Sequence, residues 1–121
     1  MDQFRFRTWQ VYKDAQELFS LVLQVVKELP KDLRFEVGSQ VIRSSLSVLL
    51  NIAEGSGKTY DKELNRFLNI ALGSLYETIA AFDALRSNKL IREALYNKGD
   101  SLMLNIANQL GGFKRKLEKK N

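Results

Sequence analysis

Apolar residues recur at intervals of three and four positions along four stretches of the chain. The first stretch runs roughly from Thr8 to Leu29, and its apolar positions are Val11, Ala15, Leu18, Val22, Val25 and Leu29. Such spacing places side chains on one face of an α-helix, where they can be buried together. Pro30 has no N–H to donate and disfavours helix at the residue before it, so the sequence predicts that this helix ends near Leu29.

The second and third stretches predict two further helices. The second runs from about Glu36 to Glu54, with apolar positions at Val37, Val41, Leu46, Val48, Leu49, Ile52 and Ala53. The third follows Thr59, a predicted N-cap, and continues to about Asn88. Its apolar positions are Leu64, Phe67, Leu68, Ala71, Leu72, Leu75, Ile79, Phe82 and Leu85. Asp61 and Glu63 would lie in its first turn, where the helix dipole favours negative charge.

The fourth stretch is weaker and runs roughly from Asp100 to Lys116. It is marked by Leu102, Ile106, Leu110, Phe113 and Leu117, and residues 91–98 form either a separate short helix or its first turns. Linkers of a few residues between long helices make neighbouring helices antiparallel. The sequence therefore predicts an all-α protein, an antiparallel up-down-up-down four-helix bundle in which residues 1–121 form one domain.

The segment EGSGKT, Glu54 to Thr59, partly matches the phosphate-binding loop G-x-x-x-x-G-K-[ST]. The first glycine of that motif would stand at position 52, which is Ile52. A phosphate-binding loop also follows a buried strand, whereas an amphipathic helix is predicted here. We therefore expect a turn between the second and third helices, with Gly55 and Gly57 at positive φ just past the helix end.

The composition limits the chemistry that one chain can perform. The sequence contains neither cysteine nor histidine, which removes thiolate nucleophiles, Cys-ligated metals, and the commonest general base and metal ligand. Glu54, Glu63 and Glu77 could supply carboxylates, but di-iron bundles pair Glu with His, and further inward-pointing acids are lacking. We expect no catalytic, metal or cofactor site, and the sequence predicts that the protein is not an enzyme.

Charge is concentrated in the last quarter of the chain. The net charge is +5, and residues 91–121 contribute +4 of it, from seven basic and three acidic side chains. Most of these cations lie in the basic tail, at about residues 114–121, where the basic residues are Lys114, Arg115, Lys116, Lys119 and Lys120. They could bind a phosphate backbone by releasing counterions, or they could form a solvated helix end that suits the negative end of the dipole.

The sequence shows no segment that would direct the chain into or across a membrane. No apolar run is long enough to span a membrane, and the first ten residues, MDQFRFRTWQ, lack the apolar core of a secretory signal. We therefore expect a cytoplasmic protein without a membrane partner.

Trp9, Tyr12 and Tyr60 lie near predicted helix ends, and we expect them to pack against helices rather than to stack on bases.

One face of the second predicted helix is polar, mostly uncharged and built from small side chains. Its residues are Gln40, Ser44, Ser47, Asn51 and Glu54, flanked by Arg43 and Ser45. The third helix carries a comparable set, Arg66, Asn69, Gly73, Ser74 and Glu77. A face turned only to water usually carries Lys and Glu, and Gly73 costs about 1 kcal/mol relative to alanine in a helix interior. These two stripes therefore need an explanation.

Three arrangements account for the stripes. They could pack against each other inside the bundle, with Arg43 or Arg66 paired to Glu54 or Glu77, because buried polar groups need partners. One stripe could instead face another protomer. The third possibility is a polar binding surface, since Ser, Asn and Arg side chains suit contacts with a nucleic-acid backbone.

The segment from Phe35 to Thr78 resembles a known family through a specific pattern. The first part of the family pattern reads Q-x-x-R-[AS]-x-x-S-x-x-x-N-I-A-E-G. The residues that match it are Gln40, Arg43, Ser44, Ser47, Asn51, Ile52, Ala53, Glu54 and Gly55. The second part reads E-x-x-R-F-L-x-x-A-x-G-S-x-x-E. The residues that match it are Glu63, Arg66, Phe67, Leu68, Ala71, Gly73, Ser74 and Glu77. Over about residues 8 to 91, the chain is thereby similar to the small four-helix-bundle proteins encoded in intervening sequences of bacterial large-subunit ribosomal RNA genes. It departs from the family pattern at Ser45, Leu49, Leu50 and Lys58.

The resemblance implies an antiparallel four-helix bundle, and several members resemble ring-shaped homopentamers. A related branch serves as the accessory protein of diversity-generating retroelements, in which a basic ring binds nucleic acid and a reverse transcriptase. Five protomers of charge +5 would give a ring near +25. We therefore expect a non-catalytic, homo-oligomeric protein that binds RNA or DNA, with the cations between Lys114 and Lys120 as its contacts.

The alternative is a protein-interaction scaffold that docks a partner, such as a reverse transcriptase, through the polar stripe. In either case the interface residues that the family motif suggests are Gln40, Arg43, Ser47, Asn51, Glu54, Arg66, Ser74 and Glu77.

Overall fold

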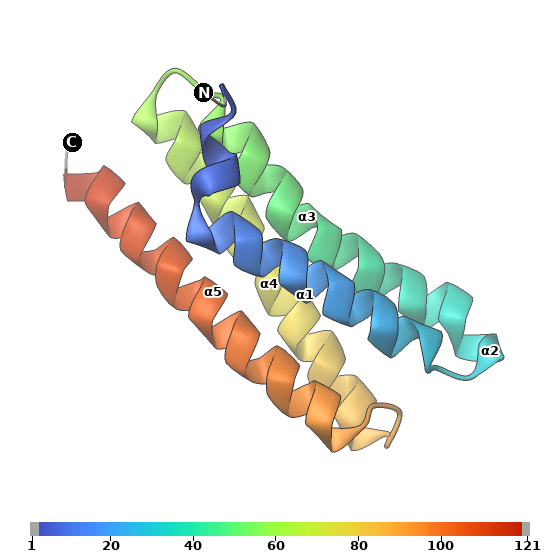
Figure 1. Cartoon of the computed structure of the whole chain (residues 1–121). Coiled ribbons are helices and arrows are strands. Elements are labelled where there is room, and N and C mark those ends of the chain that lie inside the picture. Colours follow the sequence, from blue (N-terminus) through green and yellow to red (C-terminus); the bar gives the residue numbers. More distant parts are fainter. Residues whose placement is uncertain (1–2, 120–121) are drawn as a thin grey trace.

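The computed structural model describes residues 3–119 and consists of four long helices joined by short segments (Figure 1). The long helices are α1 (Gln10–Lys27), α3 (Ser39–Ser56), α4 (Asp61–Ser87) and α5 (Glu93–Lys119). A 3-10 turn, η1 (Arg5–Thr8), precedes α1, and a short helix α2 (Lys31–Leu33) and a π-helical turn η2 (Arg34–Gly38) lead into α3. No strand occurs within residues 3–119, so the predicted all-α class is confirmed.

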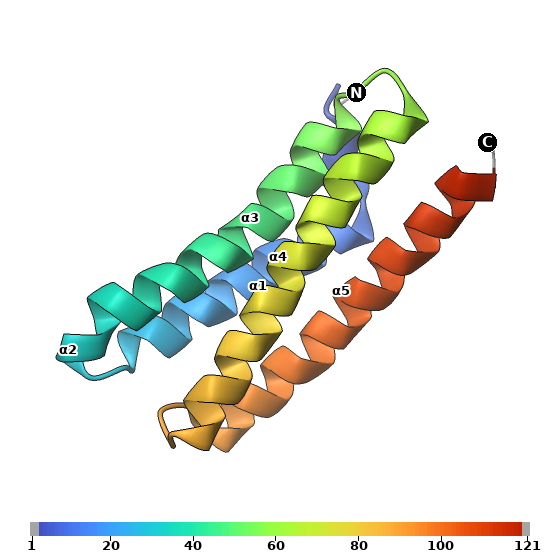
Figure 2. The ribbon, with the colours of Figure 1, turned by 180° about the vertical axis from the view of Figure 1, so that it is seen from behind.

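Successive long helices run in opposite directions, as Figures 1 and 2 show from two sides. The contact between α3 and α4 is the most extensive, and α1 and α5 close the bundle on the other side. The N-terminal segment, the α3–α4 turn and the last turns of α5 all lie at one end of the bundle. The predicted four-helix bundle is therefore confirmed.

The core is built from the apolar faces that the sequence predicts. In the first helical segment, all six predicted positions between Val11 and Leu29 are buried. The largest fully buried side chain is Phe82 of α4, which contacts Gly99 of α5: a Cβ added at Gly99 would lie 2.4 Å from Phe82 Cε2. Burying each large apolar side chain contributes about 1.5–3 kcal/mol, so these faces supply most of the favourable free energy of folding.

Two helix starts differ from the prediction. α5 begins at Glu93 rather than near Asp100, so residues 91–98 contain its first turns and not a separate helix. Gly99 is tolerated inside this helix because the ring of Phe82 occupies the space that a side chain would need. The N-cap of α4 is Tyr60 and not Thr59, and no side chain caps this helix. Asp61 and Glu63 do lie in its first turn, as predicted.

The EGSGKT segment forms the last turn of α3 and the turn that follows. A helix precedes it, as predicted, but the expected positive φ at Gly55 and Gly57 is wrong, because Gly57 ends α3 with a φ of −86° and no described glycine has a positive φ. Gly55 serves packing instead. A Cβ there would lie 2.8 Å from Phe67 Cβ and 3.0 Å from Leu64 Cδ1, so glycine at this position allows α4 to approach α3 closely.

Candidate functional site

The two polar stripes meet along the line where α3 and α4 pack, which we call the α3–α4 seam. Ser44 Oγ and Thr78 Oγ1 lie 2.8 Å apart, and so do Ser47 Oγ and Ser74 Oγ. Asn51 Nδ2 donates to Ser47 Oγ at 3.0 Å and to the Ser47 carbonyl at 2.8 Å. The interpretation that the stripes satisfy each other inside the bundle is therefore confirmed for these residues.

Thr78 is the residue of the seam that the sequence did not single out. It is fully buried, and its hydroxyl bonds both Ser44 Oγ and the Ser74 carbonyl, the latter at 3.0 Å. Thr78 lies four residues after Ser74 on the predicted polar face of the third helix, so helical spacing alone could have identified it. Hydroxyl groups that are paired in this way cost little to bury.

The side chains at the rim of the seam, unlike the hydroxyl groups beneath them, have no partner among the described residues. Gln40, Arg43 and Glu77 surround a groove of about 220 Å³ above Ser44, Ser47 and Ser74. The three rim side chains are exposed and make no hydrogen bond or ion pair within residues 3–119. The expected pairing of Arg43 or Arg66 with Glu54 or Glu77 is therefore wrong. The Arg66 guanidinium lies 4.6 Å from the ring centroid of Phe67 instead.

Gly73 is a further feature of this face that packing within the protomer does not explain. It lies in the middle of α4 and is exposed, and a Cβ added there would meet no atom within 4 Å. Packing within the protomer therefore does not require a glycine, although glycine costs about 1 kcal/mol in a helix interior. The exposed apolar side chains of Leu50 on α3, and of Ile70 and Tyr76 on α4, belong to the same pair of helices.

The predicted basic residues lie in the last turns of α5, at the end of the bundle that also holds the N-terminus (Figure 1). We call this region the basic end. Lys114, Arg115, Lys116 and Lys119 form no hydrogen bond or ion pair within residues 3–119, and Lys120 lies outside the described residues. The four cations therefore keep their charge available at the surface.

An aromatic contact joins the start of α1 to the last turns of α5 at the basic end. The rings of Trp9 and Phe113 lie 4.9 Å apart between centroids, and the Arg5 guanidinium lies 5.3 Å from the Trp9 ring. Arg5 Nε also donates to the Ser56 carbonyl at 2.9 Å, which ties η1 to the end of α3. Trp9 and Tyr12 pack against the core as predicted, but Tyr60 is 70% exposed and does not.

Beside this contact lies a cavity of about 390 Å³, which we call the Trp9–Phe113 pocket. It is lined by Trp9, Gln10, Val11, Gln109, Gly112, Phe113 and Lys116. Residues 109, 112, 113 and 116 are spaced three, one and three apart, so they share one face of α5. The pocket was not predicted, because the apolar spacing places Phe113 on the core face and no sequence pattern marks Gln10 or Gln109.

A buried carboxylate fixes two of the lining residues. Asp14 of α1 is only 7% exposed, and its two oxygens accept hydrogen bonds from Gln10 Nε2 at 2.9 Å and from Gln109 Nε2 at 2.7 Å. Burying a carboxylate is unfavourable unless it is hydrogen-bonded, so these two amides stabilise it. The bond to Gln109 also connects α1 to the C-terminal half of α5.

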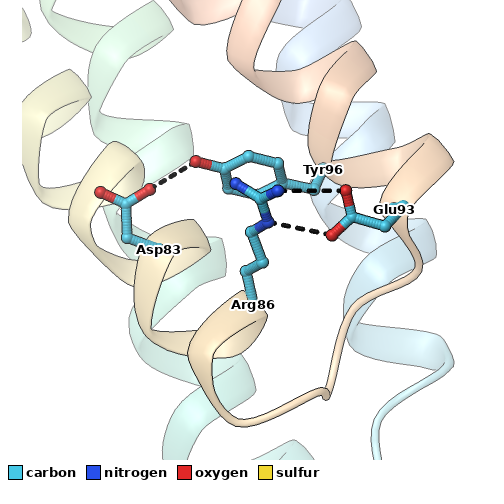
Figure 3. Close-up of polar contacts among 4 residues, drawn as sticks. All are labelled: Asp83, Arg86, Glu93 and Tyr96. Atoms are coloured by element: carbon cyan, nitrogen blue, oxygen red, sulfur yellow. Dashed lines mark hydrogen bonds and ion pairs between the residues drawn. The ribbon is translucent and has the colours of Figure 1, made fainter.

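At the opposite end of the bundle several charged groups on α4, on α5 and after α1 are paired, and Figure 3 shows those that join α4 to α5. Arg86 of α4 donates to both oxygens of Glu93 of α5, at 2.9 and 3.2 Å, while the Tyr96 hydroxyl donates to Asp83 at 2.8 Å. This hydrogen bond to Asp83 raises the pKa of Tyr96 above its ordinary value. Arg92 in turn donates to both oxygens of Glu28 after α1, at 2.8 and 2.9 Å, which lowers the pKa of Glu28.

Neither a metal cluster nor a membrane helix is found in the described part of the chain. No three or more acidic side chains among residues 3–119 lie close enough together to hold a metal ion. None of the helices in this range is both long and apolar enough to cross a membrane.

Comparison with known proteins gives one family and one similar structure. A family model described as 23S rRNA-intervening sequence protein matches residues 7–112. A crystal structure of a protein of unknown function from the S23 ribosomal protein family of Bacteroides thetaiotaomicron is similar, with a TM-score of 0.80 and 23% sequence identity. That match covers 86% of this chain and 97% of the other, and at this identity it supports the fold alone. No curated protein matches the sequence significantly.

Proposed function

The chain belongs to the 23S rRNA-intervening sequence protein family, and we propose that it is a non-catalytic protein that assembles with copies of itself and binds RNA or DNA through its basic end. The observation that supports binding is the set of four unpaired cations on the last turns of α5. The family match ends at residue 112, so these cations are an argument from this chain and not from its family.

The distribution of charge supports a nucleic-acid ligand. Of the net charge of +5, residues 91–121 carry +4, and the rest of the chain is close to neutral. A nucleic acid releases condensed counterions when cations replace them, and this favourable term grows with the number of phosphates contacted. Four cations within six residues of one helix can each contact a phosphate without first breaking an ion pair.

The α3–α4 seam supports self-assembly. Its rim presents Arg43 and Glu77, which have opposite charges and no partner within the protomer's described residues, beside the exposed Gly73. A face that carries both charges can pair with the same face of another copy, and a glycine lets a second helix approach closely. Five copies, as the family resemblance implies, would bring five basic ends into one particle with a charge near +25.

The absence of catalytic residue types supports the non-catalytic part of the proposal. One chain offers no histidine and no cysteine, and among residues 3–119 no acidic cluster could hold a metal. The proposed RNA or DNA ligand also supports a cytoplasmic location.

Binding is tested by fluorescence anisotropy with labelled single-stranded RNA and DNA at several salt concentrations. We expect log affinity to fall linearly with log salt, with a slope of about −0.7 for each phosphate contacted on a single strand. Four contacts per protomer then give a slope near −3. The absence of binding at low salt, or binding that is independent of salt, would reject the proposed function.

Assembly is tested separately by light scattering. We expect a particle several times larger than the 13.9 kDa chain, and we expect Arg43→Glu and Glu77→Arg each to reduce it towards the monomer. The double reversal should restore assembly if the two residues pair across the interface. If both single variants assemble normally but no longer capture a reverse transcriptase, the seam docks that partner and the scaffold function is favoured.

A further inference from the structure

The Trp9–Phe113 pocket has the size and lining of a site for one planar group. Its volume of about 390 Å³ lies at the low end of the range for small-molecule sites, which are mostly apolar with a few fixed polar groups. Trp9, just before α1, and Phe113 of α5 supply aromatic surface. Trp9 is held in place by two contacts: the Phe113 ring lies 4.9 Å away between centroids and is tilted by 59°, and the Arg5 guanidinium lies 5.3 Å from the Trp9 ring centroid.

Two adjacent glycines lie in α5 next to the pocket, and Gly112 lines it. Gly111 and Gly112 lie inside α5, although glycine is the least favourable residue after proline within a helix. A Cβ added at Gly112 would meet only Arg115 Nη2, at 3.8 Å, and one added at Gly111 would meet only Arg115 Nη1, at 3.4 Å. Packing within the chain therefore requires neither glycine, but a side chain at Gly112 would stand at the wall of the pocket.

The charges around the pocket favour an anionic ligand. Lys116 lines the cavity, and the Arg115 guanidinium lies beside Gly112. Arg5 adds a third cation next to Trp9. The carboxylate oxygens of Asp14 are turned towards the two glutamine amides, which donate hydrogen bonds to them, so the three cations lie nearer the opening than this acid group does. A ligand with a planar aromatic part and flanking negative charges matches this arrangement.

The polar part of the lining can contact the edge of such a ring. Gln10 and Gln109 each use Nε2 to hold Asp14. Their Oε1 atoms accept no hydrogen bond within residues 3–119, so two acceptors remain for the amino and imino groups of a ligand.

We propose that the Trp9–Phe113 pocket takes one unpaired base of a single-stranded nucleic acid, while Arg5, Arg115 and Lys116 contact the flanking phosphates. This inference rests on the proposed function, because it names the form of nucleic acid that the basic end binds. Aromatic side chains that stack on bases and cations that follow the backbone are the common elements of single-strand binding. In a duplex the bases are paired and stacked, so the pocket selects single strands.

The test uses the fluorescence of Trp9, which is the only tryptophan in the chain. The full-length protein is titrated with a short single-stranded RNA, with the same sequence as a duplex, and with inorganic polyphosphate. We expect the single strand to quench Trp9 emission and to bind about tenfold more tightly than the duplex, because one stacked base contributes about five- to 150-fold in affinity. Polyphosphate should bind without quenching.

A matched pair of variants locates the base. Gly112→Leu places a side chain at the pocket, whereas Gly111→Leu makes the same change one residue earlier, outside the lining. Both retain all charges and both exchange glycine for a better helix former. We expect Gly112→Leu to bind the single strand about tenfold more weakly without quenching, and Gly111→Leu to bind and quench like the unmodified chain. Circular dichroism confirms that each variant is folded.

The outcomes separate this inference from the proposed function. If neither RNA nor polyphosphate binds, the proposed function fails, and the inference fails with it. If RNA and polyphosphate bind equally and Trp9 emission is unchanged, the basic end binds phosphate chains but the pocket takes no base. Unchanged binding and quenching in Gly112→Leu would also overturn the inference, as would equal affinity for the duplex.

Discussion

The two ends of α5 carry similar numbers of charged residues in opposite arrangements. At its N-terminal end, Glu93 accepts two hydrogen bonds from Arg86, and Tyr96 donates one to Asp83 (Figure 3). Arg92, just before the helix, donates two hydrogen bonds to Glu28. At its C-terminal end, the cations from Lys114 to Lys119 make no such bonds within residues 3–119. Charged side chains thus attach α5 to neighbouring segments at one end, whereas at the other end they remain available to a ligand.

The difference shows where the position of α5 is determined. Exposed ion pairs contribute little to stability, but bidentate pairs fix orientation, so the first end aligns α5 with α1 and α4. The second end is attached through the Trp9–Phe113 contact and the bond from Gln109 to Asp14. Because Trp9, Phe113 and Gln109 also line the pocket, attachment and the proposed ligand binding are linked at the basic end.

The largest expected effect comes from removing the positive charge of the basic end. In this variant, glutamine replaces Lys114, Arg115, Lys116 and Lys119 together. We expect the affinity for single-stranded RNA to fall about 100-fold or more at low salt, because each lost phosphate contact removes the release of a counterion. Fluorescence anisotropy measures the affinity.

The matched control replaces four exposed cations at the opposite end by glutamine, namely Lys27, Lys31, Lys89 and Lys98. The net charge changes by the same amount, so affinity should change only a few-fold through the general field of the protein. Equal losses in the two variants would mean that net charge, and not the basic end, determines binding.

The sequence could predict features that depend on spacing along one helix. The buried positions of α1 and the pairing of Ser47 with Ser74 both follow from residues repeated every three or four positions on neighbouring helices. The ion pairs expected for Arg43 and Glu77 were wrong, because ion pairing depends on side-chain reach and not only on which helix face a residue occupies.

Features that depend on contacts between distant segments could not be predicted. Glu28 and Arg92 are separated by 64 residues, and Asp14 and Gln109 by 95. Whether a charged residue is paired depends on which helix turns meet, and the sequence does not state this. The pair Gly111–Gly112 was the available signal for the pocket, since two glycines within a predicted helix are unfavourable without a reason.

The second prediction weakens the attachment of the basic end. Asp14→Ala removes the carboxylate that accepts from Gln10 and Gln109. We expect the free energy of unfolding to fall by about 2 kcal/mol, because two part-buried hydrogen bonds to a charged acceptor are lost. Urea unfolding measures this change. Hydrogen exchange should rise in residues 109–119 and stay constant in residues 93–103.

Glu17→Ala serves as the control, because it removes an exposed acid from the same helix and should change stability by less than about 0.5 kcal/mol. If Asp14→Ala raised exchange equally along the whole of α5, the two ends would not be attached independently.

The third prediction strengthens the opposite end. Lys89, in the turn between α4 and α5, has a φ of 57°, a left-handed conformation that is unfavourable for any residue with a Cβ. We expect Lys89→Gly to raise the free energy of unfolding by about 1 kcal/mol. Lys89→Ala keeps the strain and removes the same charge, so it should leave stability nearly unchanged. RNA affinity should be alike in both variants. A gain in Lys89→Ala equal to that in Lys89→Gly would assign the effect to charge instead of backbone strain.

The smallest expected effect is a pH dependence that belongs to the paired end. The hydrogen bonds from Arg92 lower the pKa of Glu28 below its ordinary value of 4.5, so the native state binds that proton less readily than the unfolded state does. The contribution to stability is therefore present above about pH 4.5 and is lost as the pH falls through the lower native pKa. For Tyr96 the pKa is raised above its ordinary value of 10.0 by the bond to Asp83. That contribution is present below pH 10 and is lost as the pH rises through the native pKa.

Glu28→Gln and Tyr96→Phe should each flatten the stability profile on one side only, the acidic side for Glu28 and the alkaline side for Tyr96. Chemical denaturation followed by circular dichroism at each pH measures the profile. The variant with glutamine at Lys114, Arg115, Lys116 and Lys119 leaves the bonds of Glu28 and Tyr96 intact, so it should keep both slopes. If that variant flattened the profile instead, the charges of the basic end would be coupled to folding, and the contrast between the two ends of α5 would not hold.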